Sequence, residues 1–234
     1  MSNPKAESYE FDFAKPLLRQ IGDLGKKYNQ RFTFHPGQYN VVGTPHEDSL
    51  RTTISDLKYH ADVLDLMGCD QNSVIVIHGG GTYGNKEETK KRWCRQFYQL
   101  PKNVQKRLVL ENCEKNFSVQ DCLDVSKEIG IPVVFDTHHY TCYNHFHPNE
   151  TQKPARAYIP EILETWNKRN IKTKFHISEQ GKGRVGHHSD YIENIPEYLL
   201  EIPKMYNQPI DILVEAKKKE LAIFQLYKKY PYLN

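Results

Sequence analysis

The sequence lacks the cysteine spacings that are typical of a metal site or of a disulfide framework. Its five cysteines are odd in number, are scattered along the chain and include no Cys-x-x-Cys pair. This pattern argues against a thiolate zinc knuckle and against a disulfide-rich secreted scaffold. A reducing intracellular compartment, cytoplasm or nucleus, is therefore expected.

Long apolar runs and a large charge excess are missing as well. No run approaches the roughly 20 apolar residues of a membrane span, and the segment 1–5 does not begin a signal peptide. The 32 Lys and Arg residues against 29 Asp and Glu give a net charge of +3. Such a balance is compatible with a polyanionic partner without requiring one. The sequence predicts a protein that is neither secreted nor embedded in a membrane.

Short apolar β-type runs alternate with helical patterns along the chain. Strands are predicted over 31–35, 73–78, 107–112, 131–139, 173–177 and 210–215. Helices are predicted over 11–24, 47–67, 85–100, 118–129, 155–168, 191–205 and 216–230, with Ser118 as an N-cap. Residues 1–10 are expected to be flexible, and residues 11–234 to form one α/β domain. Strict alternation implies parallel strands with helices outside them.

Each predicted strand ends in a residue type that binds divalent metals. These residues are His35, His78, Glu111, Asp136 with His139, His176 and Glu215. Strand ends spread along a line in a doubly wound sheet but face one mouth in a barrel, so the pattern favours a TIM-barrel-like fold. One histidine of this kind is more often structural than a ligand. The joint occurrence predicts a metal site, because burying so many ionisable groups without a metal is costly.

The ligand types in this set indicate which metals can bind and which class of reaction they can catalyse. Imidazoles and carboxylates without a thiolate suit Mn²⁺, Zn²⁺, Co²⁺ or Fe²⁺, and His188, after the fifth strand, can complete the set. Polynuclear sites of this kind activate water and stabilise charge in phosphoryl transfer. The sequence therefore predicts a metal-dependent enzyme with no organic cofactor.

Three loops offer groups that can contact nucleic acid. Gln38 and Tyr39 directly follow the first strand, where an amide and an aromatic ring can probe or wedge between bases. Tyr83 and Lys86 belong to a glycine-rich segment at a helix start, and Arg184 to a basic loop. Each loop is also open to interpretation as an ordinary solvated turn.

Several motifs together resemble those of the UV damage endonucleases. They are Phe34-His35-Pro36-Gly37-Gln38-Tyr39, His78-Gly79-Gly80 with Tyr83-Gly84-Asn85-Lys86, Leu110-Glu111-Asn112, Phe135-Asp136-Thr137-His138-His139, Lys174-Phe175-His176-Ile177-Ser178, His188-Ser189-Asp190-Tyr191 and Glu215-Ala216-Lys217. The resemblance implies a (β/α)₈ barrel that nicks double-stranded DNA immediately 5′ to ultraviolet photoproducts, using two or three divalent ions, typically Mn²⁺.

The resemblance also implies residue roles. Metal ligation falls to His35, His78, Glu111, Asp136, His139, His176, His188 and Glu215. Catalytic roles fall to Lys174, beside the metals, and to Glu111 and His176. Gln38 and Tyr39 match the pair that probes the damaged bases and holds the duplex open. Tyr83, Lys86 and Arg184 are predicted to contact DNA, and His138 is expected to support the ligands without binding metal itself.

The N-terminal part departs from the family pattern. The family has two further βα units before the helix predicted at 11–24, and nothing in residues 1–30 matches them. About six of eight units are therefore expected here, and a longer product is one source that could supply the others. The main hypothesis is a repair endonuclease specific for pyrimidine dimers. The alternatives are a metal-dependent sugar isomerase-type barrel and a catalytically impaired remnant that binds damaged DNA.

Overall fold

The structure is a computed structural model that describes residues 11–233. The predicted flexible segment 1–10 lies outside the described residues. The chain divides into two compact units. The first comprises the described residues up to Glu111 together with Asp124–Pro132, and the second comprises Asn112–Leu123 and the described residues from Val133 onward.

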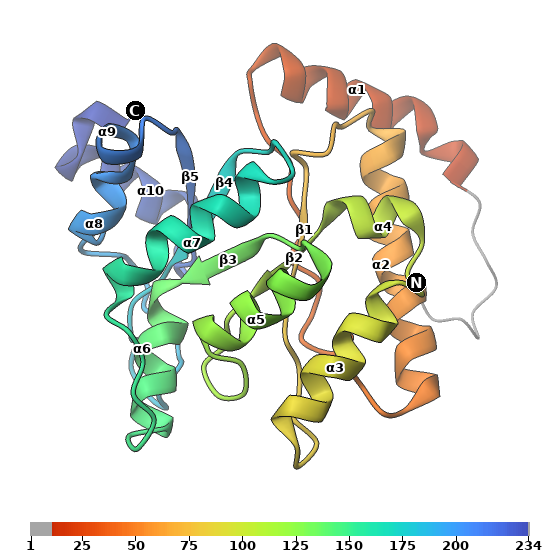
Figure 1. Ribbon diagram of the computed structural model, residues 1–234. Coiled ribbons are helices and arrows are strands. Elements are labelled where there is room, and N and C mark those ends of the chain that lie inside the picture. The colour runs from red at the N-terminus through yellow and green to blue at the C-terminus, as the bar shows by residue number, and fades with distance from the viewer. Residues whose placement is uncertain (1–10, 234) are drawn as a thin grey trace. The chain divides into compact units, whose positions relative to one another are not determined.

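The first unit is built from two paired strands and the helices that precede and follow them (Figure 1). Its elements are η1 (Phe11–Phe13), α1 (Lys15–Lys27), α2 (Glu47–Leu66), β1 (Ile75–His78), α3 (Lys86–Phe97), α4 (Lys102–Arg107) and β2 (Leu108–Glu111), and α5 (Val119–Ile129) is divided between the units. β1 and β2 pair in parallel, with His78 opposite Glu111. Two predicted ligands thus come from adjacent positions at the ends of two neighbouring strands.

The prediction of a full strand over 31–35 was wrong. The structure has a single parallel bridge there, between Phe34 and Ile75. The Phe34 N–H donates to the Val74 carbonyl (3.0 Å), and the Val76 N–H donates to the Phe34 carbonyl (2.8 Å). Pro36, which has no N–H to continue the pairing, directly follows this point and opens a turn. The direction of the segment is nevertheless that of a parallel strand, and His35 stands at its end.

Two features hold the helices and the connecting segment of the first unit in place: the close backbone approach of α1 to the end of α2, and the hydrogen bonds of the buried Arg107. A Cβ atom at Gly22 of α1 would lie 1.8 Å from the Met67 carbonyl oxygen, so α1 packs onto the end of α2 only because glycine stands there (Figure 1). Arg107, 6% exposed, donates to the Asp65 carboxylate (2.7 Å) and to the carbonyls of Cys69 (2.8 Å) and Ser73 (2.9 Å). These bonds hold the segment that leads from α2 into β1.

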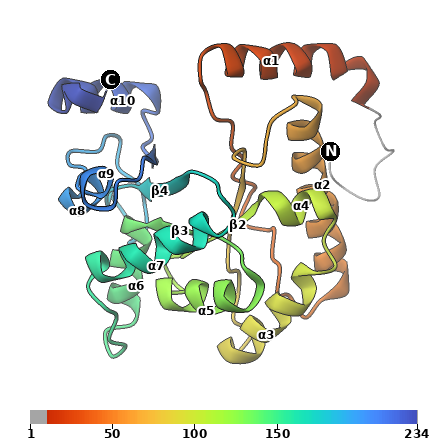
Figure 2. The same cartoon turned by 45° about the horizontal axis from the view of Figure 1, so that its top comes forward.

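The second unit contains three parallel strands in the order β3–β4–β5. Its elements are β3 (Val133–Asp136), α6 (Thr137–Phe146), α7 (Ala155–Asn167), β4 (Thr173–Ile177), α8 (Glu197–Leu200), α9 (Ile202–Tyr206), β5 (Ile210–Val214), α10 (Glu220–Lys229) and η2 (Pro231–Leu233). α7 lies beside β3 (Figure 2), where the Trp166 indole N–H donates to the Val133 carbonyl (2.7 Å) and the Val133 N–H to the Thr165 hydroxyl (3.0 Å). The pairing sets Asp136 opposite His176.

The predicted strand over 131–139 was too long at its C-terminal end. β3 stops at Asp136, and α6 begins at Thr137. The cause is the Asp136 side chain, which accepts a hydrogen bond from the His139 backbone N–H (2.7 Å) and so acts as the N-cap of α6. His138 and His139 consequently occupy the first turn of a helix, and they point in different directions.

The single helix predicted over 191–205 was also wrong. Two short helices, α8 and α9, replace it. Pro196 is the N-cap of α8 and Pro203 lies in the first turn of α9, two positions that tolerate a residue without an N–H. The N-cap prediction at Ser118 is confirmed, since its hydroxyl accepts from the Asp121 N–H (3.2 Å). No helix among residues 11–233 is both long and apolar enough to cross a membrane.

Candidate metal centre

The first unit brings three predicted ligands together around one carboxylate oxygen. His35 Nε2 lies 2.9 Å from Glu111 Oε2, and His78 Nε2 lies 3.3 Å from the same oxygen. The two imidazole rings meet edge to face, with centroids 5.2 Å apart. Glu111 is fully buried, whereas the two histidine side chains are 31% and 25% exposed. The carboxylate is therefore shielded from solvent, whereas both imidazoles that contact it are partly exposed.

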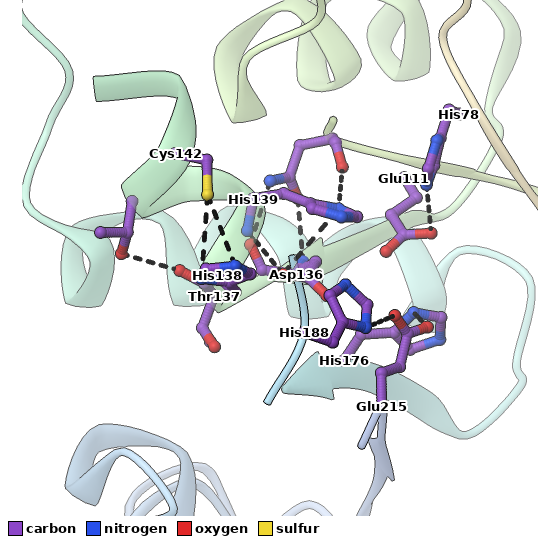
Figure 3. Close-up of polar contacts among 12 residues, drawn as sticks. His78, Glu111, Asp136, Thr137, His138, His139, Cys142, His176, His188 and Glu215 are labelled. Atoms are coloured by element: carbon purple, nitrogen blue, oxygen red, sulfur yellow. Dashed lines mark hydrogen bonds and ion pairs between the residues drawn. The ribbon is translucent and has the colours of Figure 1, made fainter. Parts of the chain in front are cut away.

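In the second unit, each carboxylate oxygen of Glu215 faces a different imidazole. His176 Nδ1 lies 3.1 Å from Glu215 Oε1, and His188 Nδ1 lies 3.8 Å from Glu215 Oε2. Figure 3 shows Glu215 reaching toward both rings. His176, at the end of β4, has no exposed surface, and Glu215 directly follows β5. This placement again puts an acid and imidazoles at the C-terminal ends of parallel strands.

Asp136 and His139 belong to the same unit and are fixed by hydrogen bonds. His139 Nδ1 lies 3.0 Å from the Asn112 carbonyl oxygen. Because a carbonyl only accepts, Nδ1 must carry the proton, and the lone pair is left on Nε2. A backbone carbonyl that fixes the tautomer in this way is the usual support of a metal-ligating histidine. The centroids of the His139 and His188 rings lie 6.2 Å apart.

Asn112, for which the sequence predicted no role, supports this arrangement. Its amide N–H donates to the Asp136 carbonyl (3.0 Å), and its amide oxygen accepts from the Asp136 N–H (2.9 Å). Both residues are fully buried. The side chain thus completes the backbone pairing of Asp136, while its carbonyl orients His139. The available signal was its position immediately after the strand-end acid Glu111.

A short glycine-rich loop positions His188. The Gly181 N–H donates to the His187 carbonyl (2.6 Å), the Ser189 N–H donates to the Glu179 carbonyl (2.8 Å), and Gln180 and His188 form an antiparallel bridge. A Cβ atom at Gly181 would lie 2.3 Å from the His188 carbonyl oxygen. Only glycine allows this close approach, which brings His188 back toward the strand ends.

Lys174 is buried in β4, with 5% of its surface exposed. Its side chain lies on the same face of the strand as His176, because residues two apart share a face. In the register of β4 and β5 it stands opposite Asp211. A buried ammonium on the ligand-bearing face is consistent with the predicted role beside the metals, which stays a prediction.

His138 and His139 are adjacent in the first turn of α6, but their side chains point in different directions. His138 Nε2 lies 3.5 Å from Cys142 Sγ, and the His138 ring meets that of His188 edge to face at 5.9 Å (Figure 3). Burial, and then the neighbouring His139 and His188, lower the pKa of His138 to about 4. The imidazole is therefore neutral at physiological pH. Its contacts with Cys142 and with the His188 ring are consistent with the supporting role expected from the sequence, which stays a prediction.

The turn that carries Gln38 and Tyr39 is anchored while its tip is exposed. The Asn40 amide donates to the Gly37 carbonyl (3.1 Å) and to the Asp56 carboxylate of α2 (2.8 Å). Tyr39 is 85% exposed. An anchored turn that presents an aromatic ring to solvent is suited to contacting a partner, because the ring gains nothing from exposure in the free protein.

The remaining predicted DNA contacts lie in two other loops. Tyr83 has a positive φ of 50°, is 44% exposed, and has the Arg92 guanidinium 5.6 Å from its ring centroid. Lys86 is the first residue of α3, whose N-cap Asn85 accepts from the Glu88 N–H (3.0 Å). Arg184 is exposed in the loop that positions His188. Tyr83 and Lys86 belong to the first unit, and Arg184 belongs to the second.

The donor atoms present fit divalent transition metals. The described residues include two groups of histidine and glutamate side chains that could hold a metal ion. Each group combines imidazole nitrogens with carboxylate oxygens and contains no thiolate. In addition, a carbonyl fixes the tautomer of one histidine. The ligand chemistry expected from the sequence is thus present in both units.

Comparison with known proteins identifies a family. A family model described as UV-endonuclease UvdE matches residues 1–234. A putative UV-damage endonuclease of Acanthamoeba polyphaga mimivirus is 37% identical over 95% of this chain and 67% of its own length. A UV DNA damage endonuclease of Bacillus cereus (strain B4264) is 36% identical over 93% of this chain and 68% of its own length. A UV-damage endonuclease of Schizosaccharomyces pombe is 35% identical, and this chain covers 38% of its length.

Solved structures give the same result for the fold. The crystal structure of SacUVDE matches with a TM-score of 0.82 and 33% identity, covering 98% of this chain and 76% of that one. Endonuclease IV from Thermus thermophilus matches with a TM-score of 0.62 at 15% identity, a likeness that concerns the fold alone. The TIM-barrel-like α/β class predicted from the sequence is confirmed. The chain belongs to the UV-endonuclease UvdE family.

Proposed function

We propose that this protein is a metal-dependent repair endonuclease that cleaves one strand of duplex DNA immediately 5′ to ultraviolet photoproducts. The observation that carries the proposal is the convergence of His35 and His78 on the buried Glu111 carboxylate, at the ends of parallel strands. The relatives from Bacillus cereus and Schizosaccharomyces pombe are named as endonucleases of UV damage. Because the proposed substrate is cellular DNA, we place the enzyme inside the cell, in the cytoplasm or nucleus.

The proposed ligands are the eight strand-end and loop residues predicted from the sequence. They are His35, His78, Glu111, Asp136, His139, His176, His188 and Glu215. We propose Mn²⁺, in two or three copies, as the metal. Divalent ions bound by such groups lower the pKa of water and neutralise charge that develops on a phosphate during its hydrolysis.

The protein's own groups prepare this chemistry by holding the ligands in place. Glu111 and Glu215 each face two imidazoles, so their positions do not depend on solvent. The Asn112 carbonyl keeps the proton of His139 on Nδ1. Lys174, on the ligand-bearing face of β4, adds positive charge that favours a phosphate nearby. Preorganised groups of this kind contribute because they need not reorient during the reaction.

DNA is proposed to be read by loops and not by the strand ends. Gln38 and Tyr39 probe the bases at the lesion, and Tyr83, Lys86 and Arg184 contact the backbone or stack on neighbouring bases. The support is the exposure of Tyr39 on an anchored turn and the basic, glycine-rich character of the other two loops. These assignments predict that substitutions in the loops change the discrimination between damaged and intact DNA, whereas substitutions of the proposed metal ligands change the rate of cleavage.

Nicking of an irradiated duplex tests the function directly. With Mn²⁺ present, the protein is expected to nick an ultraviolet-irradiated oligonucleotide duplex and to leave the same duplex intact when it has not been irradiated. End-labelled strands resolved on a denaturing gel locate the cut relative to the lesion. A folded, metal-loaded protein that cuts neither duplex, or both equally, would disprove the proposal.

Tyr39→Ala is expected to weaken the discrimination between damaged and intact duplex by about tenfold, since stacking of one base on an aromatic ring contributes about 1–3 kcal/mol. Binding of both duplexes is measured in the presence of a chelator, so that cleavage does not interfere. Tyr28→Ala is the matched control, because Tyr28 is also an exposed tyrosine of the first unit, at 63%. An unchanged ratio in Tyr39→Ala would mean that the loop is only a turn.

A further inference from the structure

One short segment of the second unit, residues 112–115, contacts α6 at both ends of the helix. In the first turn, His139 Nδ1 donates to the Asn112 carbonyl (3.0 Å). At the other end, Nε2 of His147, the residue that directly follows α6, lies 2.7 Å from the Lys115 carbonyl oxygen. Because a carbonyl only accepts, His147 Nε2 must carry a proton and donate. Two histidines about two turns apart therefore join α6 to this segment.

Segment 112–117 is held together by its own hydrogen bonds. The Cys113 N–H donates to the Phe117 carbonyl (2.9 Å), and the Cys113 sulfur accepts from the N–H groups of Asn116 (3.3 Å) and Phe117 (3.2 Å). Cys113 is 5% exposed and Phe117 has no exposed surface. Because the turn is bonded to itself and packed into the core, it moves as one piece. A displacement at Lys115 is therefore transmitted to Asn112.

Three contacts orient the His147 ring. Besides its bond to the Lys115 carbonyl, its Nδ1 lies 3.2 Å from Glu150 Oε1, and its face stacks on the Tyr143 ring at a centroid distance of 4.1 Å. The Tyr143 hydroxyl in turn donates to Glu150 Oε2 (2.8 Å), and Tyr143 is 1% exposed. The His147 side chain is 29% exposed, so the ring lies at the surface but has a defined orientation.

Asn112 is the point at which this arrangement reaches the proposed metal centre. Its side chain completes the backbone pairing of Asp136, and its carbonyl keeps the proton of His139 on Nδ1. This tautomer places the lone pair of His139 on Nε2. Removal of a group that orients a ligand in this way typically costs about 10–100-fold in metal affinity. A residue that holds Asn112 in place is therefore expected to affect the metal.

We propose that His147 is a positioning residue for the metal centre. Its bond to the Lys115 carbonyl holds segment 112–115 against α6. The Asn112 carbonyl thereby stays on His139 and fixes the tautomer of that ligand. His147 acts through the segment and not on the metal or the substrate. The inference rests on the proposed function in one respect, namely that His139 is a metal ligand.

Nitrogen NMR of the histidine rings tests the proposal without any reaction. The rings are labelled with ¹⁵N, the protein is kept in chelator, and the signals of His139 and His147 are identified by their loss in His139→Gln and His147→Leu. In the wild type, His139 is expected to carry its proton on Nδ1 and His147 on Nε2. A wild-type His147 ring without a proton on Nε2 would overturn the proposal before any substitution is considered.

His147→Leu removes the donor and keeps an apolar contact with the Tyr143 ring. This variant is expected to give a second His139 signal, from the tautomer with the proton on Nε2. His147→Gln is expected to restore a single tautomer, because the glutamine amide offers an N–H at about the place of the imidazole Nε2. A His139 ring that is unchanged in folded His147→Leu, or changed just as much in His147→Gln, would refute the positioning role.

Ile202→Val is the matched control for stability. It shortens a fully buried side chain of α9, outside α6, and so lowers the Tm by a core defect. Its His139 ring is expected to keep the wild-type tautomer. The same second signal in Ile202→Val would mean that loss of stability alone releases His139, and the role of His147 would then be only structural.

Metal affinity gives a second measurement that does not depend on cleavage. His147→Leu is expected to raise the Mn²⁺ concentration needed for half-saturation about tenfold, as followed by the electron paramagnetic resonance of free Mn²⁺. His147→Gln and Ile202→Val are expected to bind Mn²⁺ as the wild type does. Wild-type affinity in folded His147→Leu would contradict the proposal.

These results separate the positioning role from the proposed function. If the wild-type protein does not nick irradiated DNA while the His139 tautomer and Mn²⁺ affinity depend on His147, the proposed function fails and the positioning role stands. If it nicks irradiated DNA but His147→Leu changes neither property, the function stands and the positioning role fails. When both hold, His147→Leu is expected to lower kcat at limiting Mn²⁺ with little change in KM for the irradiated duplex.

Discussion

Glu111→Gln is expected to lower the rate of nicking of irradiated duplex DNA by at least about a thousandfold, or ~4 kcal/mol of transition-state stabilisation. The substitution keeps the size of the side chain but removes its charge. His35 and His78 both point at one Glu111 oxygen, within 2.9 and 3.3 Å. Without the carboxylate, the proposed site in the first unit loses its only anionic ligand. The rate is measured under single-turnover conditions with Mn²⁺ in excess.

The control for this variant is Glu128→Gln, an exposed glutamate at the end of α5. It carries the same chemical change and is expected to nick at the wild-type rate. Binding of the irradiated duplex by Glu111→Gln should stay within about threefold of wild type, because the proposed damage contacts lie in loops. Full activity in a folded Glu111→Gln protein would remove this residue from the reaction.

Removal of divalent metal is expected to abolish nicking of irradiated DNA, with a loss of at least about a thousandfold that Mn²⁺ restores. The structure gives the physical reason, since each unit places two imidazoles within 4 Å of one carboxylate, a set of donors that suits a cation. Bound metal should also raise the Tm, because it binds the folded protein and not the unfolded chain. Activity and thermal unfolding are followed after dialysis against chelator and after addition of Mn²⁺, with Mg²⁺ as the comparison ion.

Metal content separates this expectation from the alternative of a catalytically impaired remnant. A repair endonuclease of the proposed kind should hold two or three ions per chain after dialysis into buffer with Mn²⁺. A remnant that only binds damaged DNA should hold fewer than two and should bind irradiated duplex without cutting it. Nicking that continues undiminished in chelator would contradict a metal-dependent mechanism. The likeness to D-psicose 3-epimerase, at 13% identity, concerns the fold alone and gives no support to a sugar isomerase.

Much of the secondary structure followed from local patterns. β1, β2 and β4 are short segments rich in aliphatic, β-branched or aromatic residues, so the local pattern located them, and α2 and α7 fall within one residue of the predicted bounds. The predictions were wrong where one side chain or one missing backbone N–H determines where a helix or strand begins or ends. Asp136 caps α6 and ends β3, and Pro196 and Pro203 divide one helical pattern into two helices. Such effects depend on single contacts and not on periodicity.

The sequence by itself determined the fold class, the family and the residue types of the ligand set. Strand-end placement of an acid or a histidine is visible in the order of residues, and parallel pairing places the ends of adjacent strands at one edge. The tertiary structure decided which groups meet within each unit and in which orientation. The shared Glu111 oxygen, the His139 tautomer set by Asn112, and the bond from His147 to the Lys115 carbonyl all depend on distances between segments far apart in the chain. Local pattern carries no information about such distances, because packing of the side chains sets them.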